Sequence, residues 1–216
     1  GTEVDLSAVA IANYRRLHLD CLVCLGGGGT LKNAHRLMKQ GGINVVHLPK
    51  TIDNDVWGTD ACFGYDTALQ IVSEAIDRLH STADSHHRIM VIETMGHNAG
   101  WLALGAGVAG GADVILIPEI PYNLDYVAES LVARLRKGRR FSIVVVAEGA
   151  APISPDAESG NGGKKRKKRN SGELSVAGAG FTGIGAELAA ELQARTHLEA
   201  RVTVLGHLQR GGTPSP

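Results

Sequence analysis

The chain contains 216 residues, of which 44% are hydrophobic and 20% charged, enough for one large domain or two smaller lobes with apolar cores. Its 22 basic and 22 acidic side chains give a formal net charge of zero, so no overall field favours nucleic acid or a membrane surface. The sequence contains no stretch with the length of a membrane span and no signal-peptide pattern at its start, so we expect a cytoplasmic protein that binds neither nucleic acid nor membrane.

Helix-like segments alternate with short apolar runs along the chain. Helices are predicted at residues 4–17, 31–40, 65–80, 98–109, 124–137 and 183–196. Strands are predicted at residues 21–25, 44–48, 88–93, 113–117, 141–147 and 201–205. This alternation predicts an α/β fold with parallel sheets wrapped by helices, whose ligands bind at the carboxyl ends of the strands.

The first strand, at residues 21–25, has no polar alternation, which suits a parallel strand covered on both faces. Four consecutive glycines and Thr30 follow it. A Gly-rich turn before a helix lets backbone N–H groups approach an anion closely, and Thr30 is a candidate cap for that helix. Because the spacing matches neither the Rossmann fingerprint nor the lysine-bearing P-loop, a phosphate-binding turn and a merely tight turn both remain open.

The three cysteines are Cys21, Cys24 and Cys62. We interpret them as reduced core residues of an intracellular protein, because no second ligand pair follows to complete a zinc site.

The stretch PKTIDND, residues 49–55, follows a predicted strand and carries Lys50, Thr51, Asp53 and Asp55. At a strand end, such a group can hold a metal-bound phosphoryl donor while one carboxylate accepts a proton from an attacking hydroxyl. The structural alternative is an Asx-rich turn that caps the next element.

Residues 151–171 break the pattern, being rich in Pro, Gly, Ser and Asn around the run KKRKKR at 164–169. Adjacent cations repel one another, so we predict a disordered surface loop inside the domain. A nuclear signal or a patch for polyanions is the alternative, although no interleaved aromatic residues support stacking on nucleic-acid bases.

Four motifs occur in the order and spacing found in 6-phosphofructokinases: PKTIDND, MGHNAGW at 95–101, AEGA at 147–150 and LGHLQRGG at 205–212. The chain resembles that family from about residue 10 to residue 216, and the four-glycine turn stands where the family has its phosphate-donor turn. The resemblance implies a two-lobed α/β enzyme that transfers a phosphoryl group to the 1-hydroxyl of fructose 6-phosphate with Mg²⁺. It also implies a homo-oligomer, a tetramer or dimer, and a chain that is a fragment lacking both ends of the family's length.

By resemblance, residues 1–64 with 206–216 form the donor lobe, and residues 65–205 form the sugar lobe that contains the basic loop. In the donor lobe, Asp53 is implied to be the general base, Thr51 to hydrogen-bond the transferring phosphoryl group, and Asp55 to hold Mg²⁺. The remaining donor-binding residues implied by the family are Gly27, Gly28, Gly29, Thr30 and Lys50.

In the sugar lobe, Met95, Gly96 and His97 are implied to line the sugar site, and Glu148 to accept hydrogen bonds from sugar hydroxyls. His207 and Arg210 are implied to bind the 6-phosphate from the same subunit, whereas Arg88 and Arg201 reach it from the adjacent subunit. Trp101 is expected to pack in the core.

Three positions depart from the common family pattern. Gly28 stands where most members have an acidic residue that helps to hold magnesium, so catalytic competence depends on its loss being tolerated. His97 stands where an arginine is common. Gly29 leaves room for the α-phosphate of a nucleotide, whereas Lys50 is typical of pyrophosphate-dependent members, and together they resemble a mixed branch that uses ATP. The alternatives are a pyrophosphate-dependent enzyme and a catalytically impaired relative that still binds sugar phosphate.

Overall fold

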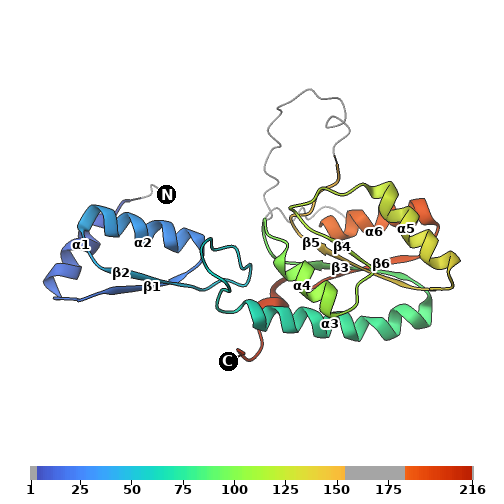
Figure 1. Ribbon diagram of the computed structural model, residues 1–216, viewed down its shortest axis with the longest axis horizontal. Helices are drawn as coiled ribbons and strands as arrows, with labels where there is room; N and C mark the ends of the chain where they lie inside the picture. Colours follow the sequence, from blue (N-terminus) through green and yellow to red (C-terminus); the bar gives the residue numbers. More distant parts are fainter. Residues whose placement is uncertain (1–3, 154–182, 216) are drawn as a thin grey trace, which may run out of the picture. The chain divides into compact units, whose positions relative to one another are not determined.

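The computed structural model describes residues 4–153 and 183–215, which divide into two compact units. The first unit contains the residues up to Asp66 together with those from Pro214 onward, and the second contains Thr67–Thr213. Both units consist of parallel strands and helices, so the predicted α/β class is confirmed (Figure 1). The basic run predicted to be a disordered loop, residues 164–169, lies outside the described residues.

The first unit has two parallel strands and two helices among its described residues. β1 (Leu22–Gly26) pairs with β2 (Val45–Pro49), with Gly26 opposite Pro49 at their carboxyl ends. α2 (Gly28–Gly41) packs against both strands, and α1 (Ser7–Arg16) packs against α2. α2 therefore covers one side of the strand pair, and α1 lies against α2 (Figure 1).

The other side of this strand pair exposes apolar side chains, since Val23, Leu25 and Val46 are 52%, 63% and 49% exposed. The prediction that the first strand is covered on both faces is therefore wrong for the described residues: its side chains alternate because the unit's helices cover one face. The prediction that all three cysteines are core residues is also wrong. Cys21 is exposed, Cys24 is half-buried, and only Cys62 is buried, although all three thiols are free.

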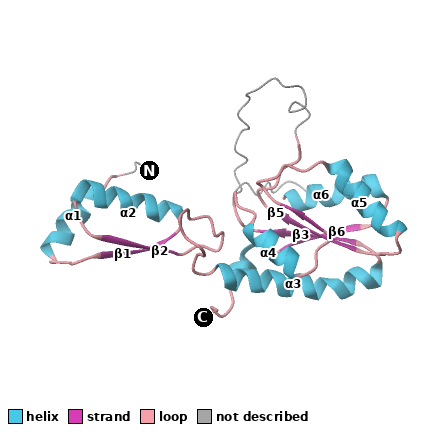
Figure 2. Ribbon diagram, in the orientation of Figure 1, coloured by secondary structure: helices cyan, strands magenta, loops and turns pink. Residues whose placement is uncertain are grey.

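The second unit has a parallel sheet in the order β4-β5-β3-β6 within the described part of the chain. The strands are β3 (Ile89–Thr94), β4 (Val114–Leu116), β5 (Ser142–Ala147) and β6 (Ala200–Val204). The helices are α3 (Tyr65–His86), α4 (Trp101–Ala109), α5 (Leu124–Arg136) and α6 (Ile184–Thr196). Figures 1 and 2 show α5 and α6 above this sheet and α3 and α4 below it.

The period-2 alternation of side chains along β3 and β5 creates two cores, one on each face of the sheet. Ile89 and Val91 of β3 pack in the core beneath α5 and α6. Met90 and Ile92 pack in the other core, against α3 and α4. Because every residue of β5 is buried, the middle of the sheet reads in sequence as a continuous apolar run, as expected for a parallel strand covered on both faces.

The element boundaries differ from prediction mainly at helix ends. α3 continues to His86 where the sequence predicts an end at residue 80, and a short 3₁₀ helix, η2 (Gly206–Arg210), was not predicted. Within residues 4–153 and 183–215, no helix combines the length and the apolar character needed to span a membrane.

Candidate functional site

The four-glycine turn connects β1 directly to the first turn of α2. Gly27 is the N-cap and its carbonyl accepts the first helical hydrogen bond from the Leu31 N–H at 3.1 Å, but no side chain caps this end. The prediction that Thr30 is the cap is wrong, because Thr30 lies inside the helix and its Oγ1 would be 2.1 Å from a Cβ at Gly26. The leading N–H groups of α2 have no partner within the helix, which is the arrangement that favours an anion.

The PKTIDND segment begins where β2 ends and lies beside this turn. The Lys50 N–H donates to the Gly26 carbonyl at 2.9 Å, which continues the β1–β2 pairing by one residue. A Cβ at Gly27 would lie 3.6 Å from the Thr51 Cβ. The first unit thus brings Thr51 next to the N-terminus of α2, as the sequence predicts for a site at the carboxyl ends of parallel strands.

The loop after Thr51 is held at both ends. The Asp53 N–H donates to Thr51 Oγ1 at 3.2 Å, and Asn54 adopts a left-handed conformation at φ 53°. The Asn54 Oδ1 accepts a hydrogen bond from the Cys62 N–H at 2.8 Å, so Asn54, which the sequence analysis missed, fastens the loop to the segment before α3. Asp53 is half-buried, whereas Asp55 is exposed.

Space remains open at two positions of the turn. A Cβ at Gly28 or at Gly29 would meet no heavy atom within 4 Å. Neither residue has a positive φ, so a side chain at either position is sterically compatible with the backbone. The fold therefore has room for a carboxylate side chain at position 28, although the sequence has glycine there.

In the second unit, three of the predicted sugar-site residues meet beyond the carboxyl ends of β3 and β5. The His97 N–H donates to Glu148 Oε1 at 2.7 Å, and the Glu148 N–H donates to the Thr94 carbonyl at 2.8 Å. A Cβ at Gly149 would lie 2.2 Å from the His97 carbonyl oxygen, so the two turns are in direct contact. Gly96, with φ 141°, allows the turn that precedes His97.

The strand β6, which pairs with β3 in the same sheet, leads into η2, the short helix that carries His207 and Arg210. Both side chains are exposed, whereas Gln209 between them is 1% exposed. The Gln209 Oε1 accepts a hydrogen bond from the Met95 N–H at 3.1 Å. The structure thus places η2 beside the turn after β3, and sequence reasoning missed the residue that joins them.

Arg88 and Arg201 lie at the opposite ends of the strands, near the amino ends of β3 and β6. Arg88 Nε donates to Glu199 Oε2 at 2.6 Å, and the Arg201 guanidinium binds the other oxygen of the same carboxylate. Arg88 lowers the pKa of the Glu199 carboxyl by its hydrogen bond, with Arg201 acting in the same direction. Both arginines thus lie near the amino ends of the strands, whereas Glu148 follows the carboxyl end of β5, and their action on a neighbouring subunit stays a prediction.

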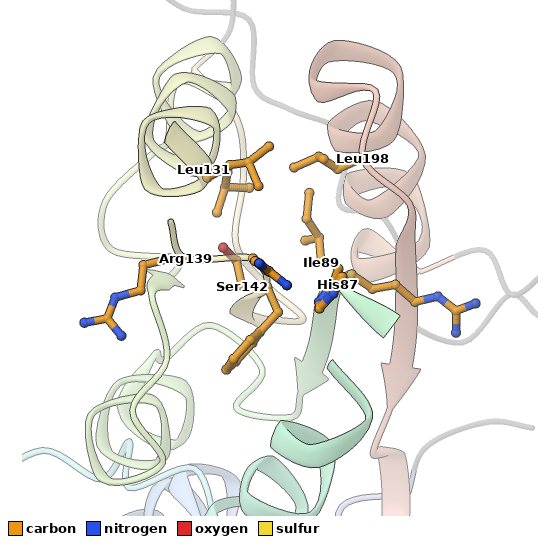
Figure 3. Close-up of a pocket in the computed structure, with 10 residues that line it drawn as sticks. His87, Ile89, Leu131, Arg139, Ser142 and Leu198 are labelled. Atoms are coloured by element: carbon orange, nitrogen blue, oxygen red, sulfur yellow. The ribbon is translucent and has the colours of Figure 1, made fainter. Parts of the chain in front are cut away.

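A shallow pocket lies at this same amino edge (Figure 3). Leu131 of α5 and Leu198 approach each other at one end of it, while the side chain of Arg139 points away. Arg88, Arg139 and Arg140 line it together with His87, so three of its lining side chains are guanidinium groups. None of the predicted sugar-site residues of the carboxyl edge lines this pocket.

Glu93, the penultimate residue of β3, lies at the N-terminus of α6. Its Oε2 accepts a hydrogen bond from the Gly185 N–H at 2.8 Å. Burial raises the pKa of the Glu93 carboxyl; the Gly185 hydrogen bond opposes this rise, and the negative charges of Glu148 and Glu187 add to it. Sequence reasoning missed Glu93 because nothing near it in sequence marks its helix partner.

This raised pKa predicts the pH dependence of a substitution. A carboxyl whose pKa is higher in the folded than in the unfolded protein stabilises the fold at low pH, because the folded state binds the proton more tightly. That contribution to the free energy of unfolding is lost as pH rises from the unfolded-state pKa to the folded-state pKa. We therefore expect Glu93→Gln, whose amide oxygen can still accept from Gly185, to melt at a higher temperature than the wild type at pH 7. That difference should shrink below the ordinary carboxyl pKa of 4.5. Thermal melts at pH 4 and 7 check it, with Glu129→Gln, at an exposed site on α5, as the control.

The prediction for the side chain of Trp101 is wrong. The sequence analysis assigns it to the core, but it begins α4 and is 49% exposed. The reason is geometric: the face of α4 that packs on the sheet carries Leu102, Ala103 and Ala106, and Trp101 precedes that face.

The family model described as Phosphofructokinase matches residues 2–216. A protein of Spirochaeta thermophila named ATP-dependent 6-phosphofructokinase is 58% identical over 95% of this chain and 54% of its own length. One of the same name from Propionibacterium freudenreichii is 51% identical over 99% of this chain and 59% of its own. The chain thus spans about half the length of the curated relatives it matches.

Solved structures share the fold. Phosphofructokinase from Saccharomyces cerevisiae superposes with a TM-score of 0.76 at 29% identity, over 99% of this chain and 30% of that one. A pyrophosphate-dependent phosphofructokinase from Nitrosospira multiformis gives a TM-score of 0.74 at 22% identity, over 94% of this chain and 49% of that one. The second similarity concerns the fold alone.

Proposed function

The chain belongs to the phosphofructokinase family, and from this premise we propose that the protein transfers a phosphoryl group from ATP to the 1-hydroxyl of fructose 6-phosphate, a reaction of glycolysis. The observation that carries the proposal is the juxtaposition of the PKTIDND loop with the uncapped N-terminus of α2. A helix N-terminus attracts phosphate, and a carboxylate two residues from a hydroxyl supplies a base. The names of the relatives from Spirochaeta thermophila and Propionibacterium freudenreichii support ATP as the donor.

In this proposal the first unit binds the donor and removes the proton. The N–H groups of Gly28 and Gly29, with Gly27, Thr30 and Lys50 nearby, contact the donor phosphates. Thr51 donates its hydroxyl to the moving phosphoryl group, and Asp53 accepts the proton of the attacking sugar hydroxyl. Phosphoryl transfer demands mainly positioning and charge neutralisation from the protein, which these groups supply.

Magnesium would be held by Asp55 together with the donor phosphates. The described residues contain no cluster of three or more His, Cys, Asp or Glu side chains arranged to hold a metal. Mg²⁺ is usually bound through one or two carboxylates, substrate phosphates and several waters, so the exposed carboxylate of Asp55, in the loop that begins at Thr51, fits it. When bound, the ion neutralises charge on the donor phosphates.

The second unit would bind the sugar phosphate. Glu148 accepts hydrogen bonds from sugar hydroxyls, Met95, Gly96 and His97 line the ring, and His207 and Arg210 bind the 6-phosphate. Arg88 and Arg201, which are held together by Glu199 at the far edge of the sheet, would contribute to the site of a neighbouring subunit. We therefore propose a homo-oligomer, a dimer or tetramer, in the cytoplasm.

One alternative is favoured by a specific residue. Gly28 provides no carboxylate for magnesium, so a relative that binds fructose 6-phosphate without transferring phosphate is the second candidate. In that case, fructose 6-phosphate raises the melting temperature while no donor yields fructose 1,6-bisphosphate.

A coupled assay for fructose 1,6-bisphosphate tests the proposal, using the purified protein, fructose 6-phosphate and Mg²⁺ with either ATP or pyrophosphate. Activity with ATP alone is the expected result. Activity with pyrophosphate alone would overturn the donor assignment and mean that Lys50 outweighs Gly29. If neither donor yields fructose 1,6-bisphosphate but fructose 6-phosphate raises the melting temperature of the protein, the catalytically impaired alternative is supported.

Gly28→Asp should strengthen magnesium-dependent activity. The turn has room for the side chain, and an acid at the first position of α2 also stabilises the helix by about 0.3–1 kcal/mol through the helix dipole. A carboxylate that adds about 1.4 kcal/mol to Mg²⁺ binding would lower the concentration needed for half-maximal activity about tenfold. Titration of activity with Mg²⁺ measures this effect.

Gly28→Asn is the matched control, since it has the same size and no charge. An equal gain in both variants would show that the removal of glycine, and not the added carboxylate, was responsible.

A further inference from the structure

We propose that Gln209 is a positioning residue that fixes the 3₁₀ helix carrying His207 and Arg210 to the turn carrying Met95, Gly96 and His97. The inference rests on the proposed fructose 6-phosphate site and adds to it a residue that touches no ligand. It concerns two segments that follow neighbouring strands, β3 and β6, of the second unit.

Burial and hydrogen bonding single out Gln209. It is 1% exposed and ranks among the largest fully buried side chains of the described residues. Its Oε1 accepts from the Met95 N–H at 3.1 Å, while its Nε2 donates to the Gly206 carbonyl at 3.0 Å. Replacing this buried amide by an apolar residue would remove a hydrogen-bond partner from the Met95 N–H and from the Gly206 carbonyl, both of which are half-buried.

The flanking residues face the other way. His207 and Arg210 are exposed and Leu208 is 73% exposed, so among residues 207–210 the buried side chain is Gln209. In a 3₁₀ helix with three residues per turn, fixing one side chain sets the directions of its neighbours. Gln209 therefore decides where the imidazole of His207 and the guanidinium of Arg210 point.

The hydrogen bond between Gln209 and Met95 also links η2 to the residues that contact the sugar in the proposal. Met95 precedes Gly96 and His97, and the His97 N–H is bound to Glu148 Oε1 at 2.7 Å. A series of hydrogen bonds and short turns therefore runs from the end of β6, through Gln209 and the turn after β3, to Glu148 after β5. Since the proposed phosphate and hydroxyl ligands lie at its two ends, loss of Gln209 should weaken binding of the whole sugar phosphate.

The test compares Gln209→Met with Gln193→Met in the purified protein. Methionine has nearly the volume of glutamine but makes neither hydrogen bond. Gln193 is exposed, but it controls for the loss of the hydrogen bond, because its Oε1 accepts from the Ala200 N–H at the same distance of 3.1 Å, at the amino end of β6. Calorimetry measures the dissociation constant of fructose 6-phosphate, steady-state kinetics the KM for ATP, and hydrogen exchange the protection of the Met95 amide.

We expect Gln209→Met to raise the dissociation constant of fructose 6-phosphate about tenfold, the change that corresponds to one lost interaction of about 1.4 kcal/mol. The KM for ATP should stay unchanged and the Met95 amide should exchange faster, whereas Gln193→Met should show neither change in sugar binding nor faster exchange at Met95. Equal sugar affinity and equal Met95 exchange in Gln209→Met and the wild type would overturn the inference. So would a loss of sugar and ATP binding in equal proportion, which indicates general damage.

Gln209→Glu adds a readout that a merely structural role would not produce. A protonated carboxyl can accept from Met95 and donate to Gly206, whereas the ionised form has no donor, so its sugar affinity relative to the wild type at the same pH should fall as pH rises. A constant ratio across pH would contradict the role of the Nε2 donor. If the wild-type protein binds no fructose 6-phosphate at all, the proposed function fails and this inference loses its premise; a variant-specific loss leaves the function standing.

Discussion

Asp53→Asn is expected to lower kcat for phosphoryl transfer by about a thousandfold, within the range of roughly 10²–10⁴ that a positioned general base contributes. The substitution keeps the size of the side chain and the Asp53 N–H that donates to Thr51 Oγ1, so the loop should keep its shape. What it removes is the proton acceptor for the sugar hydroxyl. Because the sugar-binding residues proposed here lie in the second unit, the dissociation constant of fructose 6-phosphate should be unchanged.

Asp60→Asn is the control for this prediction, since Asp60 is an exposed aspartate of the same unit. Rapid-quench measurement of the chemical step separates the loss of the base from any change in product release. If Asp53→Asn retains more than a tenth of wild-type kcat, another group accepts the proton.

Mixing two variants with weakened sugar binding is expected to restore activity at low fructose 6-phosphate concentration if Arg88 serves a neighbouring subunit. Arg88→Ala and Arg210→Ala should each raise the KM for fructose 6-phosphate roughly 10- to 100-fold, because a hydrogen bond to a charged group contributes about 1.5–3 kcal/mol. In a hybrid dimer, the Arg88→Ala subunit retains its own Arg210 and receives an intact Arg88 from its partner. Random mixing should therefore recover about a quarter of wild-type activity, since half of the dimers are hybrids with one intact site in two.

The control pair is Asp53→Asn with Arg210→Ala, both of which act within their own subunit in the proposal. No hybrid of that pair has an intact site, so its activity should not recover. Failure of the Arg88 pair to recover, under conditions where subunits exchange, would mean that Arg88 does not act across an interface.

The architecture was predictable because its signals are local. The strands β3 and β5 are covered on both faces, and each contains an unbroken apolar run in the sequence, residues 89–92 and 143–147. β1 has the same apolar run in sequence but exposes Val23 and Leu25, because the unit's helices cover one face. Apolar composition indicates a strand, but it does not reveal how many faces the surrounding elements cover.

Site residues were predictable where a motif names them. Thr51 lies beside the four-glycine turn, the Asp53 N–H donates to Thr51, and His97 and Glu148 are joined by a hydrogen bond, as the order of strands and loops implies. Their catalytic roles remain predictions.

The partners that hold these motifs were not predictable. Gln209 and Met95 are 114 positions apart and Glu93 and Gly185 are 92 apart, and nothing local in either member points to the other. A buried glutamine between exposed residues resembles in sequence one more polar residue of a turn. The fold was needed to show that it faces inward.

The pairing of β3 with β6 has a consequence for synthesis of the chain. The ion pair between Arg88 and Glu199 at the start of these strands joins residues 111 positions apart. At about 5–20 residues per second, the ribosome needs roughly 5–20 s to deliver β6 after β3 has emerged. During that interval the nascent β3 lacks its neighbour on one edge, and an apolar strand with an open edge is a template for aggregation. Chaperone capture and misfolding during translation should therefore concentrate on the segment Ile89–Thr94.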